Sequence, residues 1–269
     1  MSNKEQLKDF RTSLGRLVHG DCLDAMKTLP DKSFKVMVTS PPYNILNSTG
    51  GGLRYGKKKG GRELWASPGL RDGYDGYSDN MEYGEYVEWQ RKCLTEMMRL
   101  LREDGVIYYN HKWRTQNKLL QDRSSIVEGF PVRQIIIWHR NGGLNFNKYM
   151  FVHDYEVIYM IAKPDFKLAK EALGMTTVWR INYAVNNEHP APFPLELPLR
   201  CLTSAGEGPV LDPFMGSGTT ALAAEKMGLE WVGVEQSKKY FSMARKRLRK
   251  AAGHVSLGSG GKELKPLWS

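Results

Sequence analysis

The fold of this chain is most constrained by a glycine-rich turn between an apolar strand and a helix, at residues 211–220. The helix that follows covers residues 219–227, and a second strand then ends at Glu235. A strand, a helix and a strand in this order predict a parallel βαβ unit. Gly216 and Gly218 carry no Cβ, so the backbone of the turn can approach a ligand closely. Glu235 stands about where a ribose-binding acid lies in nucleotide-binding units of this kind.

A second constraint is a double-proline turn that follows another apolar strand. Residues 34–39 form a β-rich run that leads into Ser40, Pro41, Pro42 and Tyr43. Proline cannot donate to a sheet ladder, so the strand ends here and the turn lies at its carboxyl end. A proline-rich surface turn or a polyproline ligand is the alternative, and both the preceding strand and the glycine-rich turn elsewhere in the chain disfavour it.

The double-proline turn suits the methylation of an amino group on a nucleic-acid base. The lone pair of such an amine is delocalised into the ring, and it must be freed and aimed at the methyl donor. Acceptors for the two amine protons achieve this, and the Ser40 hydroxyl and the Pro41 carbonyl can supply them. The Tyr43 ring can stack on a base turned out of the duplex. Methylation of cytosine C5 is disfavoured because it needs a cysteine nucleophile, and none of the three cysteines follows a proline in a suitable loop.

Strand-like and helical segments alternate along the chain. The expected strands are residues 16–21, 34–39, 106–109, 133–139, 155–161, 209–212 and 230–235. The expected helices are residues 21–29, 82–101, 219–227 and about 238–250, the last capped by Ser237. The pattern predicts an α/β fold in a single domain, with a mostly parallel sheet and an antiparallel edge hairpin. The domain is expected over residues 1–252, with a flexible tail over residues 253–269.

Charge and cysteine content indicate which class of partner the protein binds and in which cellular compartment it lies. The chain carries 39 Lys+Arg against 29 Asp+Glu, and the formal charge of +10 favours a polyanion such as DNA. Its three scattered cysteines fit neither a disulfide framework nor a zinc site. The N-terminal residues lack the apolar core of a signal peptide, and no apolar run approaches a bilayer span. We therefore expect a cytoplasmic protein with no metal and no membrane partner.

One long segment, residues 46–80, has no periodicity and is rich in Gly, Lys, Arg and Tyr. A loop of this length inside a compact domain is usually functional or disordered. Its cations could contact DNA phosphates, and its aromatic side chains could stack on bases or insert between them. The candidate DNA-binding residues are Arg54, Lys57, Lys58, Lys59 and Arg62. A disordered surface insertion is the alternative.

The two turns, in this order, resemble those of the β class of amino-methylating DNA methyltransferases, in which the catalytic motif precedes the cofactor turn. The resemblance runs from about Leu17 to Lys250. It implies a class I S-adenosylmethionine-dependent methyltransferase-like domain with permuted motif order, with S-adenosyl-L-methionine as cofactor and DNA as partner. The implied catalytic residues are Ser40, Pro41, Pro42 and Tyr43. The implied cofactor-binding residues are Asp21, Cys22, Asp212, Phe214, Gly216, Ser217, Gly218, Thr219 and Glu235.

Other interpretations stay open beside this one. An NAD site is disfavoured because the turn does not follow the G-x-G-x-x-G pattern. The same chemistry on RNA or on a protein amide, and a degenerate fold that only binds nucleic acid, are further alternatives. In the family, Ser-Pro-Pro-Tyr is associated mainly with the N4 amine of cytosine and Asp-Pro-Pro-Tyr mainly with the N6 amine of adenine. Ser40 therefore predicts N4-cytosine, with N6-adenine as the alternative, while the recognition site, a homodimer and a restriction partner stay open.

Overall fold

The computed structural model describes residues 9–44, 81–116, 118–140, 149–182 and 193–255 of the 269-residue chain. Within them, a nine-stranded sheet has the order β1-β2-β11-β10-β3-β4-β8-β7-β9. Its strands are β1 (Asp9–Arg11), β2 (Gly15–His19), β3 (Phe34–Thr39), β4 (Leu101–His111), β7 (Val132–His139), β8 (Tyr155–Ala162), β9 (Val178–Arg180), β10 (Val210–Asp212) and β11 (Trp231–Glu235). A separate hairpin contains β5 (Arg114–Gln116) and β6 (Leu119–Gln121). The helices are α1 (Cys22–Lys27), α3 (Tyr83–Leu100), α4 (Ser124–Val127), the 3-10 turn η2 (Lys170–Ala172), α5 (Glu196–Ala205), α6 (Thr219–Met227) and α7 (Lys238–Val255).

The centre of the sheet is parallel, as predicted. Each of β2, β11, β10, β3 and β4 runs parallel to its neighbour in that series. β8 is antiparallel to both β4 and β7, which confirms the antiparallel pair, and β9 adds a parallel strand beyond β7. The short β1 pairs antiparallel with β2 at the other edge. β3 lies directly beside β10, so the two turns that follow these strands are brought to the same edge of the sheet although they are far apart in the chain.

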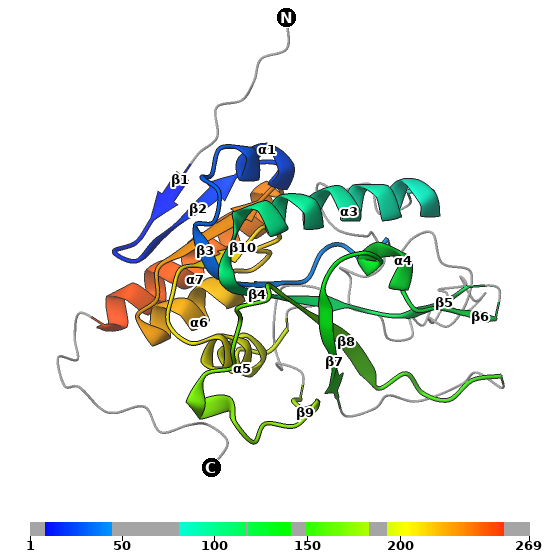
Figure 1. Cartoon of the computed structure of the whole chain (residues 1–269). Coiled ribbons are helices and arrows are strands. Elements are labelled where there is room, and N and C mark those ends of the chain that lie inside the picture. Colours follow the sequence, from blue (N-terminus) through cyan, green and yellow to red (C-terminus); the bar gives the residue numbers. More distant parts are fainter. Residues whose placement is uncertain (1–8, 45–80, 117, 141–148, 183–192, 256–269) are drawn as a thin grey trace, which may run out of the picture.

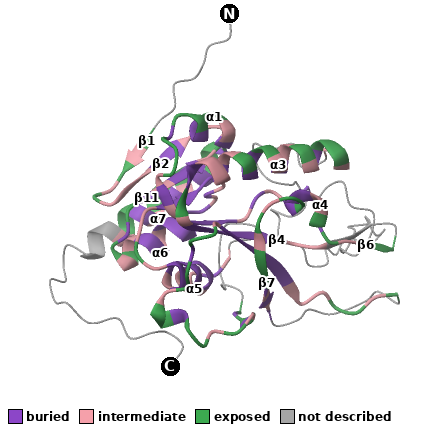
Figure 2. Cartoon of the chain, viewed as in Figure 1, coloured by how far each residue is buried: buried purple, intermediate pink, exposed green. Residues whose placement is uncertain are grey.

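Helices cover both faces of the sheet (Figure 1). α1 and α3 lie on one face, and α5, α6 and α7 lie on the other. Side chains of a strand alternate between its two faces. On β3, Val36 and Val38 belong to the core beneath α5, α6 and α7, whereas Met37 belongs to the core beneath α1 and α3. The central strands are therefore buried on both sides, as Figure 2 shows.

Two helices begin with side-chain caps where the chain leaves the sheet. Asp21 Oδ1 accepts from the amide of Leu23 at 2.8 Å and from the amide of Asp24 at 3.1 Å at the start of α1. Ser237 Oγ, the cap predicted for α7, accepts from the amide of Tyr240 at 3.2 Å. Caps of this kind stabilise a helix by about 1 kcal/mol each. They fix the direction in which α1 and α7 leave the edge that carries both turns.

α3 carries a stripe of aromatic and apolar side chains that faces the core. Tyr86, Cys93, Met97 and Leu100 are fully buried, and Trp89 is partly exposed. The helix packs this stripe against α1 and the sheet, which places Tyr86 and Trp89 close to the two turns.

Some features were not expected from the sequence. β1, β5, β6 and β9 have three residues each, too few for an alternating pattern to be visible. α7 continues to Val255, three residues into the segment expected to be a tail. Residues 256–269, the long loop at 46–80 and residues 141–148 between β7 and β8 lie outside the described residues. None of the described helices is long and apolar enough to cross a membrane.

Candidate active site

The two predicted turns meet at the carboxyl edge of the sheet. β10 ends at Asp212, and its neighbour β3 ends at Thr39, one residue before Ser40. The Thr39 hydroxyl donates to Asp212 Oδ1 at 2.7 Å. Ligands of open α/β sheets bind at this edge, where the strands end and the loops begin. The structure therefore brings the predicted acceptor turn and the predicted cofactor turn into direct contact.

Asp212 is a buried acid with one oxygen unused. Oδ1 accepts from the Thr39 hydroxyl and, at 3.0 Å, from the Phe214 amide. Oδ2 is buried and has no hydrogen-bond partner among the described residues. Burial raises the pKa of Asp212 to about 6, although the nearby Thr220 and Thr39 hydroxyls and the Phe214 amide favour its charged form. An unpaired buried acceptor is costly, so Oδ2 fits an ammonium or hydroxyl donor of the expected cofactor.

Glu235 closes the glycine-rich turn from the end of β11. Its Oε2 accepts from the Gly216 amide and its Oε1 accepts from the Ser237 amide, both at 2.7 Å. Burial raises the pKa of Glu235 to about 7, and these two amide donors oppose the shift. The carboxylate therefore ties the turn to the start of α7. Each of its oxygens has a second lone pair, so a ribose hydroxyl can still donate to it.

The rest of the glycine-rich turn packs against α7. Gly218 has a φ of +85°, and a Cβ at this position would lie 3.1 Å from the Ala244 Cβ. Arg247 Nη1 donates to the Ser217 carbonyl at 2.6 Å and to the Ser217 hydroxyl at 2.7 Å. The same nitrogen lies 3.3 Å from Thr219 Oγ1. The Ser217 and Thr219 side chains thus contact α7, and they would serve a cofactor site by holding the shape of the turn.

The strand-to-helix turn between β2 and α1 lies at the same edge. The Gly20 amide donates to the Glu235 carbonyl at 3.1 Å, which places Asp21 beside the end of β11. Asp21 is partly exposed, whereas Cys22 is buried in the first turn of α1. The Cys22 Sγ lies 3.8 Å from the Cys93 Sγ of α3. Both predicted residues are therefore near the cofactor turn, Asp21 with its carboxylate used as a helix cap and Cys22 packed on α3.

Phe214 links the cofactor turn to α3. Its ring meets the ring of Trp89 edge to face, with the ring centroids 5.7 Å apart. Trp89 packs on the core and is partly exposed, so it is a residue of this site that the sequence did not single out.

Ser40 and Tyr43 are joined across their own turn, with their hydroxyl oxygens 2.6 Å apart. The Tyr43 hydroxyl donates to Glu156 Oε2 at 3.0 Å and accepts from Asn110 Nδ2 at 2.8 Å. Tyr43 is only 5% exposed, and its ring centroid lies 5.0 Å from that of His111. The sequence assigned Tyr43 a role through its ring, and the structure adds an anchor through its hydroxyl.

The double proline is held from beneath by α3 and β4. The Tyr86 hydroxyl donates to the Pro42 carbonyl at 2.8 Å, and its oxygen lies 2.7 Å from His111 Nε2. The Pro42 carbonyl is therefore used inside the protein. Pro41, whose carbonyl is the predicted second acceptor for the amine, is buried between Ser40 and Pro42.

Three buried polar residues behind the turn were not predicted. Arg140 Nη1, just after β7, donates to Glu156 Oε1 at 2.7 Å, near the start of β8. Asn110 Nδ2, near the end of β4, donates to Glu156 Oε2 at 2.9 Å. The exposed fractions of Asn110, Arg140 and Glu156 are 2%, 4% and 6%. A sequence signal was present, because a charged or amide residue inside an apolar strand needs a buried partner.

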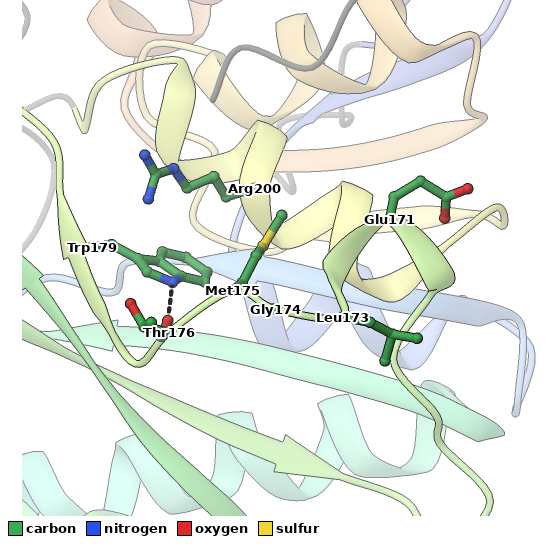
Figure 3. A pocket seen from close by; sticks show the side chains of 7 residues that line it. All are labelled: Glu171, Leu173, Gly174, Met175, Thr176, Trp179 and Arg200. Carbon is green, nitrogen blue, oxygen red and sulfur yellow. Dashed lines mark hydrogen bonds between the residues drawn. The ribbon is translucent and has the colours of Figure 1, made fainter. Parts of the chain in front are cut away.

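A separate hollow of about 310 Å³ is lined from η2, β9 and α5 (Figure 3). Arg200 lies over the Trp179 ring at 5.9 Å from its centroid, and the Trp179 indole donates to the Thr176 carbonyl at 2.8 Å. None of the predicted catalytic or cofactor-binding residues lines this hollow. Among the described residues there is also no group of side chains that could hold a metal ion. The paired turns, which the hydrogen bond between Thr39 and Asp212 holds together, are the candidate active site.

Known proteins are similar to this chain in sequence. A family model described as DNA methylase matches residues 34–246. The chain is 26% identical over 270 residues to the type II methyltransferase M.HinfI of Haemophilus influenzae, covering 91% of this chain and 70% of that protein. It is 28% identical over 300 residues to the type II methyltransferase M.ScaI of Streptomyces caespitosus, covering 92% of this chain and 88% of that protein.

Two solved structures show the same fold. The PvuII DNA methyltransferase (cytosine-N4-specific) matches with a TM-score of 0.68 at 19% identity, covering 92% of this chain and 94% of that one. The protein TTHA0409 of Thermus thermophilus, solved in complex with S-adenosyl-L-methionine, matches with a TM-score of 0.62 at 23% identity, covering 87% and 93%.

The fold and the paired turns define a class I methyltransferase-like protein in which the acceptor turn precedes the cofactor turn in the chain. The matched family model covers most of the chain, and the chain belongs to the N6_N4_Mtase family of DNA methylases. It is an S-adenosylmethionine-dependent DNA amino-methyltransferase of the N4-cytosine/N6-adenine type.

Proposed function

We propose that this chain transfers the methyl group of S-adenosylmethionine to the N4 amine of a cytosine flipped out of DNA. The observation that carries the proposal is the hydrogen bond between the Thr39 hydroxyl and Asp212, which holds the Ser40 turn beside the cofactor turn. Methyl transfer needs the amine and the methyl donor close together and aligned. Two turns at the ends of neighbouring parallel strands provide that proximity.

Some residues of the site bind the target amine, and others bind the cofactor. S-adenosylmethionine supplies an electrophilic methyl group when it is bound. The Ser40 hydroxyl accepts from the target amine and draws the nitrogen lone pair out of conjugation with the ring. The buried Asp212 Oδ2 accepts from a donor group of the cofactor, and Glu235 holds the glycine-rich turn around it. No strong general base is needed, because the methylated nitrogen is cationic and acidic and can release its proton to water.

The choice of cytosine rests on Ser40. A neutral hydroxyl orients an amine more weakly than a carboxylate does, and Ser-Pro-Pro-Tyr is associated in the family mainly with N4-cytosine. The PvuII methyltransferase, which shares this fold, is cytosine-N4-specific. The N6 amine of adenine is the alternative, because it is also an amine on an aromatic ring and can bind the same acceptors.

The biological setting that we propose is a type II restriction-modification system. This is supported by the relatives M.HinfI and M.ScaI, which are both type II methyltransferases. DNA contacts are proposed for the loop at residues 46–80, which lies outside the described residues.

Labelled methyl transfer tests the reaction class. The pure protein is incubated with methyl-labelled S-adenosylmethionine and with duplex DNA, RNA or protein acceptors. Label should enter DNA, and Asp212→Asn should abolish the transfer. Asp104→Asn is a matched control, because Asp104 pairs with Lys35 at 2.8 Å near the amino ends of β3 and β4, and it should stay active. Label in RNA or protein but none in DNA would overturn the proposal.

A further inference from the structure

A chain of hydrogen bonds leads from Ser40 into the protein and ends on a buried ion pair. The Ser40 and Tyr43 hydroxyl oxygens lie 2.6 Å apart, and the Tyr43 oxygen lies 3.0 Å from Glu156 Oε2. Glu156 Oε1 accepts from Arg140 Nη1 at 2.7 Å. Asn110 Nδ2 lies 2.8 Å from the Tyr43 oxygen and 2.9 Å from Glu156 Oε2. Apart from Ser40, every member of this chain is buried, so water competes little for its hydrogen bonds.

The direction of each hydrogen bond follows from the chemistry of the groups. A carboxylate only accepts, so the Tyr43 proton goes to Glu156. An amide NH2 only donates, so Asn110 Nδ2 cannot accept from Tyr43. With its single proton used, the Tyr43 oxygen can only accept from Ser40.

The Ser40 hydroxyl can therefore only accept a hydrogen bond from a substrate. Its own proton is used in the 2.6 Å bond to Tyr43. Asn110 Nδ2, at 3.3 Å, occupies at most one of the two lone pairs of Ser40 Oγ. One lone pair and no proton then remain for a target amine, which donates through its N–H.

We propose that Glu156 is a positioning residue for methyl transfer, which directs the hydrogen bonds so that Ser40 meets the target amine as an acceptor. The inference rests on the proposed function, because it is an amine substrate that requires an acceptor at Ser40. If Glu156 were neutral, Tyr43 could donate to Ser40, and the Ser40 proton could then face the N–H of the amine. Arg140 compensates the charge of Glu156, which allows a carboxylate to be kept in the interior.

The competing explanation is that the ion pair of Glu156 and Arg140 only stabilises the fold. The positioning role and the stabilising role make different predictions. Removing one partner of a buried ion pair that only stabilises the fold lowers the melting temperature. Loss of a hydrogen-bond direction instead lowers kcat, and it leaves cofactor binding unchanged because Glu156 bonds to the acceptor turn rather than to the glycine-rich turn.

The test compares Glu156→Gln, Tyr43→Phe and the double variant in DNA methylation. Each single variant should lower kcat about ten- to a hundredfold, with the Kd for S-adenosylmethionine and the KM for DNA unchanged. The double variant should be no worse than either single variant, because both changes break the same chain. Glu196→Gln is the control, since Glu196 also pairs with an arginine, Arg200 at 2.5 Å on α5, and it should keep the wild-type kcat.

A wild-type kcat in Tyr43→Phe or in a folded Glu156→Gln protein would overturn the inference, and so would losses that add in the double variant. If Glu156→Gln does not fold, Tyr43→Phe decides alone, because it leaves the pair of Glu156 and Arg140 intact. A wild-type protein that methylates no amine in DNA would remove the proposed function, and this inference with it.

Discussion

The buried Asp212 carboxylate forms hydrogen bonds through only one of its two oxygens. Its Oδ2 is buried without a hydrogen-bond partner among the described residues, and burial raises its pKa from 3.8 to about 6. Between these two pH values the folded, cofactor-free protein holds a proton that the unfolded chain has released. The free energy of unfolding should therefore fall as the pH rises from 3.8 to about 6. A loss of folding stability of this kind is expected where a buried residue serves ligand binding rather than the fold.

Asp212→Asn should flatten this part of the stability profile and remove a pH dependence from cofactor binding. The ionised acid attracts the cationic cofactor, so wild-type affinity should rise as the pH rises through about 6. Thermal unfolding and calorimetry from about pH 5 to 8 measure both effects. Equal affinity of the two proteins across this range would show that Asp212 does not bind the cofactor.

At the scale of the element, the turn between β10 and α6 depends on its contact with α7. Gly218, at the start of α6, has a φ of +85°, and a Cβ there would lie 3.1 Å from the Ala244 Cβ. Gly228, at the other end of α6, has a φ of +70°, and a Cβ there would have nothing within 4 Å. Substitutions at the two glycines therefore distinguish the effect of backbone strain from the effect of crowding against α7.

Gly228→Ala should lower the free energy of unfolding by about 1 kcal/mol, through backbone strain alone. Gly218→Ala should cost more and should also weaken S-adenosylmethionine binding, because the turn must move away from Ala244. Denaturant unfolding and calorimetry on both variants provide the comparison. If both variants lost the same stability and kept full cofactor affinity, the contact with α7 would have no part in shaping the turn.

Most of the longer elements could be predicted because their periodicity is visible in the sequence, although α5, with ten residues, was missed. The predicted bounds of β3 and α6, residues 34–39 and 219–227, are those observed. β9, a strand of three residues, was not predicted, and it is defined by its pairing with β7. The same holds for β1, which is defined by its pairing with β2.

At the scale of the whole molecule, the formal charge of +10 suits a polyanionic substrate, and the basic loop at residues 46–80 concentrates part of it. Deleting residues 50–62 removes Arg54, Lys57, Lys58, Lys59 and Arg62. DNA affinity should fall, and the slope of log affinity against log salt should decrease by about 0.9 for each phosphate that the protein no longer neutralises. Titrations at several salt concentrations measure this slope. An unchanged slope and affinity would make the loop a passive insertion.

The candidate active site could be predicted only where its residues are close together in the sequence. Ser40 to Tyr43 and Asp212 to Thr219 are continuous turns, so their spacing could be recognised. Glu156, Asn110 and Arg140 meet only because the strands pair. Asn110 lies opposite Ile158 in the pairing of β4 with β8, and Glu156 lies opposite Trp138 in the pairing of β7 with β8. No spacing along the chain encodes that proximity, and only the polar residues within apolar strands hinted at it.

Mass spectrometry of nucleosides tests the central claim most directly, with DNA that lacks modified bases as the substrate of the pure protein. We predict N4-methylcytosine with the wild-type chain and none with Ser40→Ala or Asp212→Asn, since one variant loses the proposed acceptor for the amine and the other loses the proposed cofactor ligand. N6-methyladenine without N4-methylcytosine would contradict the assignment of the base. The absence of both methylated amines would contradict the account of the site as a whole.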